Sequence, residues 1–159
     1  MSHGKKGGAF DMRDWVFAVV LLFSGVGAVM PACGGEAQQV GTLRIVVSGV
    51  RAERGHVHVA VCPQAVFLKD ACVYKAIVPA KRGETIAVIN GMPPGTYAAQ
   101  VYFDENDNDE LDRTFIGIPE EGVGFSNNPS FTFRAPSFAD TAFTYDGVSG
   151  AITVRLRYY

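Results

Sequence analysis

The sequence has no excess of positive charge, and this shortage excludes one large class of partners. Its 14 Lys and Arg residues are outnumbered by 16 Asp and Glu residues, which gives a net charge of −2. Proteins that follow a phosphate backbone carry a basic surface, because each contact neutralises a phosphate. We therefore expect no nucleic-acid partner.

Long helical patterns are also missing. After Ala37 no segment keeps a helical spacing of apolar residues for three turns, and neither an internal repeat nor a low-complexity linker occurs. A helical or repeat architecture is therefore not predicted. The 159 residues, 48% of them hydrophobic, are sufficient for one domain with a core and a short appendage.

The first forty residues differ from the rest and have the pattern of an export signal. Basic residues precede the apolar run 15–30, and small residues follow it through Ala37. A charged start, an apolar centre and a small-residue exit are typical of a secretory signal peptide. We therefore interpret residues 1–37 as a cleaved signal peptide, which predicts a periplasmic or secreted protein.

Two alternatives for this leader stay open. Its sixteen-residue apolar run is shorter than the ~20 residues that span a bilayer, but retention as a membrane anchor is one alternative. Cleavage before Cys33 is the other, because it would leave a thiol for lipid attachment. Pro31 stands where such lipoprotein signals usually have a small or aliphatic residue. Cleavage after Ala37 would instead release a soluble chain.

From residue 41 onward, apolar and polar residues alternate, as they do in half-buried β-strands. The first two such stretches, 43–47 and 57–61, are separated by a turn and are predicted to form a hairpin. Further strands are predicted at 73–78, 84–89, 97–103, 131–133, 141–145 and 152–158. About seven short strands separated by turns predict an all-β fold, an antiparallel β-sandwich, over residues 41–159. The segment 115–128 is rich in Gly and Pro and is expected to contain little regular structure.

The densest charge in the chain directly follows the predicted strand 97–103. Residues 104–112 read DENDNDELD, and six of these nine residues are acidic. Polar oxygens recur there at a spacing that a tight loop can wrap around a hard cation. The predicted ligands are the side chains of Asp104, Asn106, Asn108 and Asp112 and the backbone carbonyl of Glu110.

Calcium suits these ligands better than magnesium, because mixed amide, carboxylate and carbonyl oxygens tolerate irregular geometry. The loop is not an EF-hand, since Asp109 and Phe115 occupy the positions of its Gly and Glu. Six neighbouring acids repel one another unless a cation or water screens them. The alternative is a solvated acidic turn without an ion. A nearby polar segment could complete or flank the site through Glu120, Glu121, Ser126, Asn127 and Asn128.

Two of the three cysteines follow the leader, and they form an even pair. In an exported protein, Cys62 and Cys72 are expected to form a disulfide. Such a bridge would stabilise the fold by roughly 2 to 3 kcal/mol. The alternative is a pair of buried free thiols.

Two long stretches of this sequence resemble a known family. They are GTLRIVVSGVRAERGHVHVAV at 41–61 and PPGTYAAQVYFDENDNDELDRTFIGIPEEGVGFSNN at 93–128. Together they are similar to the bacterial family catalogued as domain of unknown function 2141, over nearly all of residues 41–159. The resemblance implies an exported prealbumin-like or immunoglobulin-like sandwich with no established activity. The family's acidic motif commonly reads DENGNGKLD, so Asp107 and Asp109 stand here where Gly is usual.

We therefore predict an exported binding or structural module of the cell envelope, with a Ca²⁺-stabilised loop and an unknown envelope ligand or protein as its partner. One alternative is an envelope hydrolase that uses Asp104 or Glu120. Another is a transition-metal protein, because His56 and His58 share one face of a predicted strand. A serine hydrolase is not predicted, because Ser126 is outside a nucleophile elbow and no His follows it.

Overall fold

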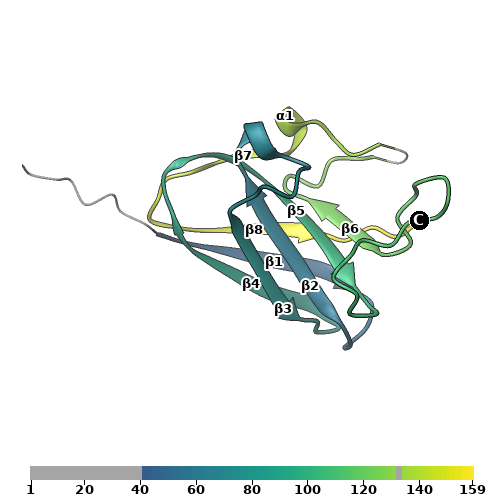
Figure 1. Cartoon of the computed structure of the whole chain (residues 1–159). Helices are drawn as coiled ribbons and strands as arrows, with labels where there is room; N and C mark the ends of the chain where they lie inside the picture. The colour runs from purple at the N-terminus through teal and green to yellow at the C-terminus, as the bar shows by residue number, and fades with distance from the viewer. Residues whose placement is uncertain (1–40, 132–133) are drawn as a thin grey trace, which may run out of the picture. The chain divides into compact units, whose positions relative to one another are not determined.

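The computed structural model describes residues 41–131 and 134–159 (Figure 1). The predicted signal peptide, its cleavage positions and Cys33 lie outside the described residues. In the described parts of the chain, no helix is long and apolar enough to cross a membrane.

The described residues form short strands and two brief helical turns. The strands are β1 Gly41–Val50, β2 His56–Cys62, β3 Tyr74–Pro79, β4 Gly83–Met92, β5 Gly95–Asp104, β6 Gly122–Phe125, β7 Ala142–Tyr145 and β8 Ser149–Arg155. The helical turns are η1 Gln64–Val66, which is a 3-10 helix, and α1 Phe138–Thr141. The prediction of an all-β fold is confirmed.

These strands form two sheets that pack as the layers of a sandwich (Figure 1). One sheet has the order β4-β1-β8, in which β1 runs antiparallel to β4 and parallel to β8. The other has the order β3-β2-β5-β6, and all its pairs are antiparallel. Strand β7 also pairs with β5, beside the first half of that strand, so β6 and β7 share one edge of β5.

The predicted hairpin between the first two strands is wrong. Strand β1 pairs with β4 and β8, whereas β2 pairs with β3 and β5 in the opposite sheet. The turn between β1 and β2 therefore crosses from one layer to the other. Alternation identifies the buried face of a strand, and both strands bury theirs in the same core, but it does not identify the neighbouring strand.

Strand β6 was not predicted, because its sequence GVGF has glycine at every second position. A Cβ on Gly122 would lie 2.6 Å from the Tyr158 ring, and one on Gly124 would lie 2.7 Å from Val154. The strand packs closely against the chain around β8, and only glycine fits on that face. In the segment 131–133, for which a strand was predicted, Phe131 lies in none and Phe133 is outside the described residues.

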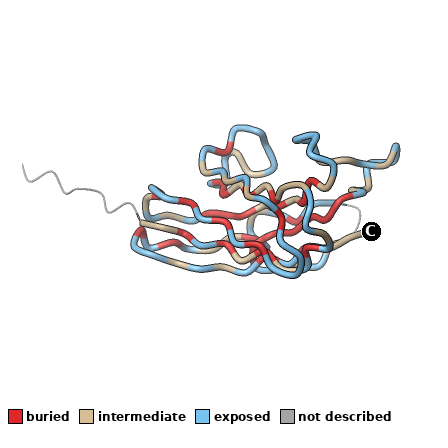
Figure 2. Tube along the Cα trace, turned by 90° about the horizontal axis from the view of Figure 1, so that it is seen from below, coloured by how far each residue is buried: buried red, intermediate tan, exposed pale blue. Residues whose placement is uncertain are grey.

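The core lies between the two sheets and is built by the alternating positions. The apolar residues of β1 pack against those of β2 and β5 across the layers, and Phe103 is the largest fully buried side chain. Buried and exposed residues accordingly alternate along the strands in Figure 2. The core extends to Phe103, so it supports β5 up to the residue before Asp104.

The structure joins Cys62 to Cys72 in the predicted disulfide, with a Cα–Cα distance of 5.1 Å. The bridge closes a short loop that contains η1. This loop contacts β5, where the Leu68 backbone N–H donates to Gln100 Oε1 at 3.1 Å. The disulfide therefore holds one wall over the outer face of the five-stranded sheet.

Candidate metal centre at the acidic loop

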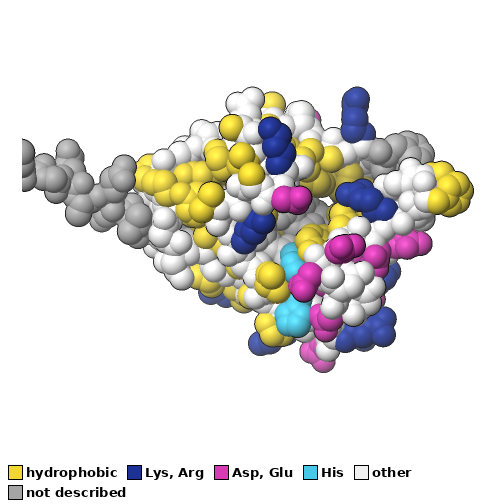
Figure 3. Space-filling view, in the orientation of Figure 1, with side chains coloured by type: hydrophobic (Ala, Val, Ile, Leu, Met, Phe, Trp, Pro, Cys, Tyr) yellow, Lys and Arg dark blue, Asp and Glu magenta, His cyan; other side chains and the backbone are white. Residues whose placement is uncertain are grey.

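The acidic loop, residues 104–112, begins at the last residue of β5. In the sheet register His56 is opposite Asp104, and His58 is opposite Tyr102, two residues earlier on β5. The described histidine side chains consequently lie beside the acidic ones (Figure 3). The core strands β2 and β5 thus bring imidazoles and carboxylates to one end of the sandwich.

Asp104 organises the loop. It is 0% exposed. Its Oδ1 accepts the backbone N–H groups of Asp107 at 2.7 Å and Asn108 at 3.3 Å, and its Oδ2 accepts that of Asp109 at 2.8 Å. Burial alone would raise the pKa of Asp104, but these three N–H groups, with His58, hold it below its usual value. A buried carboxylate is therefore kept charged by the backbone that wraps around it.

This wrapping requires two residues in the left-handed region. Asp107 has a φ of 60° and Asp109 a φ of 62°. These are the two positions at which the motif that the sequence resembles has Gly, and Asp tolerates this conformation better than most residues. The left-handed residues turn consecutive N–H groups toward the single carboxylate of Asp104.

The other predicted side-chain ligands converge within the loop. Asn106 Nδ2 donates to Asp112 Oδ2 at 2.7 Å, and Asn108 Nδ2 donates to Asp112 Oδ1 at 3.1 Å. Glu110 takes part through its backbone N–H, which donates to Asn108 Oδ1 at 2.8 Å. A half turn of each amide would present its oxygen to a cation instead of its nitrogen. The turn would give up the hydrogen bonds in which Asn106 Oδ1 accepts the Asn108 N–H at 3.1 Å and Asn108 Oδ1 accepts the Glu110 N–H. The loop thus gathers the side chains that the spacing predicted.

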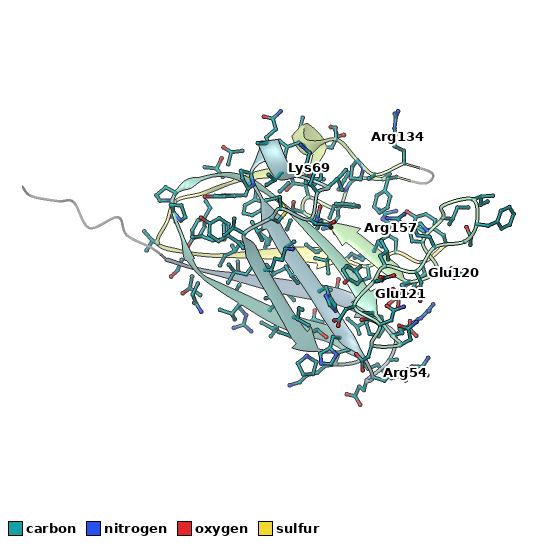
Figure 4. The ribbon with its side chains drawn as sticks, in the orientation of Figure 1. Arg54, Lys69, Glu120, Glu121, Arg134 and Arg157 are labelled. Atoms are coloured by element: carbon teal, nitrogen blue, oxygen red, sulfur yellow. A yellow bond between two sulfur atoms is a disulfide. The ribbon has the colours of Figure 1, made fainter. Side chains whose placement is uncertain are left out.

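Glu121 flanks the loop, as was expected of the polar segment, and closes it through two backbone hydrogen bonds. It is 5% exposed. Its carboxylate accepts the backbone N–H of Glu105 at 2.9 Å and that of Asp112 at 3.2 Å. Burial raises its pKa, the two N–H groups oppose that rise, and the charges of Asp104 and Asp112 add to it. Figure 4 shows Glu121 beside the end of β5 and Glu120 farther out. The two residues are both glutamate, so the sequence alone does not distinguish the one that contacts the loop.

Basic side chains of the β1–β2 turn and of the first residue of β2 contact the same loop from outside. Arg51 Nε contacts Glu105 Oε1, and Arg54 lies 3.3 Å from Glu105 Oε2. His56 Nδ1 lies 2.5 Å from Asp107 Oδ1. The two arginines neutralise Glu105, and Asp107 has His56 as its partner.

His58 lies on the inner side of the loop, with its side chain 11% exposed. Its ring stacks on Tyr102 with the centroids 4.4 Å apart, and its Nδ1 lies 2.9 Å from the Tyr102 hydroxyl. That hydroxyl donates to the Asp109 carbonyl at 3.1 Å. Burial lowers the pKa of His58 against the opposing pull of Asp104 and Asp109, and burial raises the pKa of Tyr102 to about 12.

The two histidines therefore face different carboxylates. His58 Nε2 lies 3.6 Å from Asp104 Oδ2 and 3.7 Å from Asp109 Oδ1, whereas His56 is bound to Asp107. The predicted alternative of a metal site built on both rings does not match this arrangement. Alternation placed them on one strand face but did not show their partners.

A groove of about 860 Å³ runs beside the acidic loop on the outer face of the five-stranded sheet. The loop that contains η1 forms one wall, and residues 109–119 form another. Its floor is mixed polar and aromatic, and charges of both signs lie along the walls. The residues that define it include His58, Gln100, Tyr102, Phe125, Lys69 and Glu110.

The polar segment 126–128 serves the fold and does not flank the loop, contrary to one expectation. Ser126 is 1% exposed, donates from Oγ to the Thr141 carbonyl and accepts the Ala99 N–H at 2.9 Å. Asn127 donates to the Ala142 carbonyl, and Asn128 donates to that of Thr153. These side chains join β5, β7 and β8, and the buried Ser126 is no nucleophile.

Replacing Ser126 by Ala should lower the free energy of unfolding by about 1 to 3 kcal/mol, because the buried Ala99 N–H loses its side-chain acceptor. Urea denaturation measures this change. Ser149, which is exposed on β8, is the matched control, and Ser149→Ala should change stability by less than about 0.5 kcal/mol. Equal stability of the two variants would contradict the structural role of Ser126.

No curated protein and no solved structure matches this chain. The model of one family, described as "Uncharacterized protein conserved in bacteria (DUF2141)", matches residues 45–153. That range is more than half of the chain, begins within β1 and ends within β8, and includes the whole acidic loop. The chain therefore belongs to this family of uncharacterised bacterial proteins.

Proposed function

We propose that this protein is an exported binding module of the cell envelope, in which Ca²⁺ stabilises the acidic loop. The observation that carries the proposal is the convergence of Asn106 and Asn108 on the two oxygens of Asp112, in a loop whose turn is set by Asp104. Oxygen ligands on a loop with left-handed corners suit the irregular coordination of Ca²⁺. An affinity of the extracellular type, on the order of 10⁻⁴ to 10⁻³ M, would suit export.

Charge balance supports a bound cation. Glu105 pairs with Arg51 and Arg54, and Asp107 and Asp109 each lie beside a histidine. Asp112 has no basic partner among the described residues. Asp112 accepts only neutral amide donors and the Asp112 N–H is itself tied to Glu121. A divalent ion would relieve the repulsion among these carboxylates and would favour the ordered loop.

The position of the loop connects the ion to binding. Asp109, Glu110 and Leu111 belong both to the acidic loop and to the wall of the groove. An ion that orders the loop would therefore order one wall, while the Cys62–Cys72 disulfide holds the opposite one. We propose the groove as the site of the envelope ligand.

The hydrolase alternative has less support. Both oxygens of Asp104 already accept backbone N–H groups, so this carboxylate is poorly placed to act as a base or a nucleophile. Glu120 is exposed and remains available for that role. Hydrolysis of an ester or glycoside panel that Glu120→Gln abolishes without loss of stability would favour an enzyme over a binding module.

Calcium should raise the melting temperature of the chelator-treated protein. At a tenfold to hundredfold excess over its dissociation constant, it should add about 1.4 to 2.7 kcal/mol of stability. Asp112→Asn should remove most of this increment, because it removes the charge on which both amides converge. Asp70→Asn, an exposed acid outside the loop, is the matched control and should keep the increment.

Calorimetric titration of the same three proteins measures the affinity directly. A melting temperature that does not respond to calcium, together with no heat of binding, would remove calcium from the proposal. Equal calcium increments in Asp112→Asn and Asp70→Asn would place the ion elsewhere.

A further inference from the structure

One polar atom at the inner side of the loop has no partner among the described residues. His58 Nε2 is buried and makes no hydrogen bond, although it faces two carboxylates. The distances to Asp104 Oδ2 and Asp109 Oδ1 are 3.6 and 3.7 Å, too long for a hydrogen bond. Buried polar atoms are usually satisfied, so this one needs an explanation.

One arrangement of the hydrogen bonds places the ring proton of His58 on Nδ1 and leaves Nε2 able to bind a metal ion. The Tyr102 hydroxyl has one hydrogen, and it donates that hydrogen to the Asp109 carbonyl. The hydroxyl oxygen therefore accepts from His58 Nδ1–H. The neutral ring then directs the lone pair of Nε2 toward two negatively charged oxygens. A metal ion between the three atoms would make this arrangement favourable, as a proton on Nε2 would in the metal-free protein.

We propose that His58 Nε2, Asp104 Oδ2 and Asp109 Oδ1 bind a divalent transition-metal ion of the Zn²⁺ class. The three donor atoms all lie within 4.8 Å of one another. Ligand atoms about 2.1 Å from a tetrahedral Zn²⁺ are about 3.4 Å apart, so small side-chain shifts would suffice. Imidazole nitrogen with carboxylate oxygen is a donor set that Zn²⁺ prefers and that Ca²⁺ does not.

The surroundings fit such a site in two further respects. Tyr102 fixes the orientation of His58 through its hydroxyl and its stacked ring, and the same hydroxyl holds the backbone of Asp109. Hydrogen bonds of this kind commonly orient metal-binding histidines. His58 and Asp109 also line the groove, so a fourth coordination position would be open to water or to a ligand in the groove.

This site goes beyond the proposed calcium site and shares only Asp104 with it. The calcium proposal depends on Asn106, Asn108 and Asp112, whereas the new site depends on His58 and the exposed Asp109. Asp104 is common to both because it is the hub of the loop. Either ion could therefore bind without the other, and the two proposals fail separately.

The test is a titration of the metal-free full chain with Zn²⁺ by calorimetry, and with Co²⁺ by visible absorption. We expect binding of one Zn²⁺ and tetrahedral Co²⁺ bands in the wild-type protein. His58→Gln should weaken Zn²⁺ binding by more than about 100-fold, since it removes the only nitrogen ligand. His56→Gln is the matched control on the same strand and should keep wild-type affinity.

Two further variants test the geometry. Asp109→Asn keeps a residue that tolerates its left-handed backbone and is 82% exposed in its side chain, so it should fold but lose most of the Zn²⁺ affinity. Tyr102→Phe should lower the affinity by about 10-fold to 100-fold, because the ring of His58 loses its acceptor.

Several outcomes would overturn the assignment. They are the absence of Zn²⁺ binding in the wild-type protein, unchanged binding in His58→Gln, and loss of binding in His56→Gln. His58→Gln should also keep the melting-temperature response to Ca²⁺. Loss of both responses would overturn a separate site, because it would indicate damage to the whole loop. Zn²⁺ binding without any Ca²⁺ response would support this site and remove calcium.

Discussion

Asp104→Ala should lower the free energy of unfolding by about 3 to 5 kcal/mol, because three backbone N–H groups lose a buried, charged acceptor. The carboxylate is 0% exposed, so water cannot replace it without opening the end of the sandwich. Urea denaturation of the wild-type and variant proteins measures the difference. Hydrogen exchange should show faster exchange at Asp107, Asn108 and Asp109.

Asp104→Asn is the matched control for charge. The amide keeps one oxygen as an acceptor for Asp107 and Asn108, but it places an NH₂ group against the Asp109 N–H. We therefore expect Asp104→Asn to have a free energy of unfolding between those of the wild-type protein and Asp104→Ala. If the free energy of unfolding of Asp104→Ala were less than about 1 kcal/mol below that of the wild-type protein, Asp104 would not be the residue that organises the loop.

The acidic loop could be predicted because its information is local. Side chains at every second position, from Asp104 to Asn108, lie close together in any tight loop, whatever the rest of the fold does. The arrangement of backbone N–H groups around Asp104 was harder to predict, since it depends on positive φ at Asp107 and Asp109. Only the glycines of the family motif indicated that conformation.

The sequence suggested a set of flanking residues that includes Glu121, but it could not show which of them contacts the loop, because that depends on register and tertiary packing. Glu120 and Glu121 are adjacent and identical, and only the fold buries Glu121 against the two ends of the loop. His58 was placed on the outer face of a strand by alternation. Its contact with Tyr102 follows from the pairing of β2 with β5, which periodicity does not contain.

The fold also has a part that the sequence predicts, the positions of the strands, and a part that it does not, their pairing. The strands with clear alternation, such as β1, β2 and β5, were predicted near their observed positions. Their pairing was not, because the parallel contact of β1 with β8 joins opposite ends of the domain. Strand β6 has glycine where the pattern needs an apolar side chain, so its strand character comes from pairing with β5 and from close packing against Tyr158 and Val154.

Gly55→Ala should be as damaging as the loss of Asp104, and for a related reason. Gly55 has a φ of +71°, and a Cβ there would overlap the backbone carbonyl oxygen of Asp104 and lie 2.9 Å from the Glu105 Cα. Left-handed strain of about 1 to 2 kcal/mol and a forced shift of the backbone should together cost about 3 to 5 kcal/mol. Denaturation with urea measures the sum.

Gly91→Ala separates the two contributions. Gly91 has a similar φ of +76°, but nothing lies within 4 Å of its Cβ position, so it should show the strain alone. The excess cost of Gly55→Ala then measures how tightly the β1–β2 turn packs on the start of the acidic loop.

That contact involves the backbone of Asp104 and Glu105. Gly55→Ala should therefore also bind Ca²⁺ and Zn²⁺ more weakly, whereas Gly91→Ala should show unchanged binding. Equal costs in the two variants would mean that the turn does not support the loop, and the proposed metal sites would then depend on β5 and Glu121 alone.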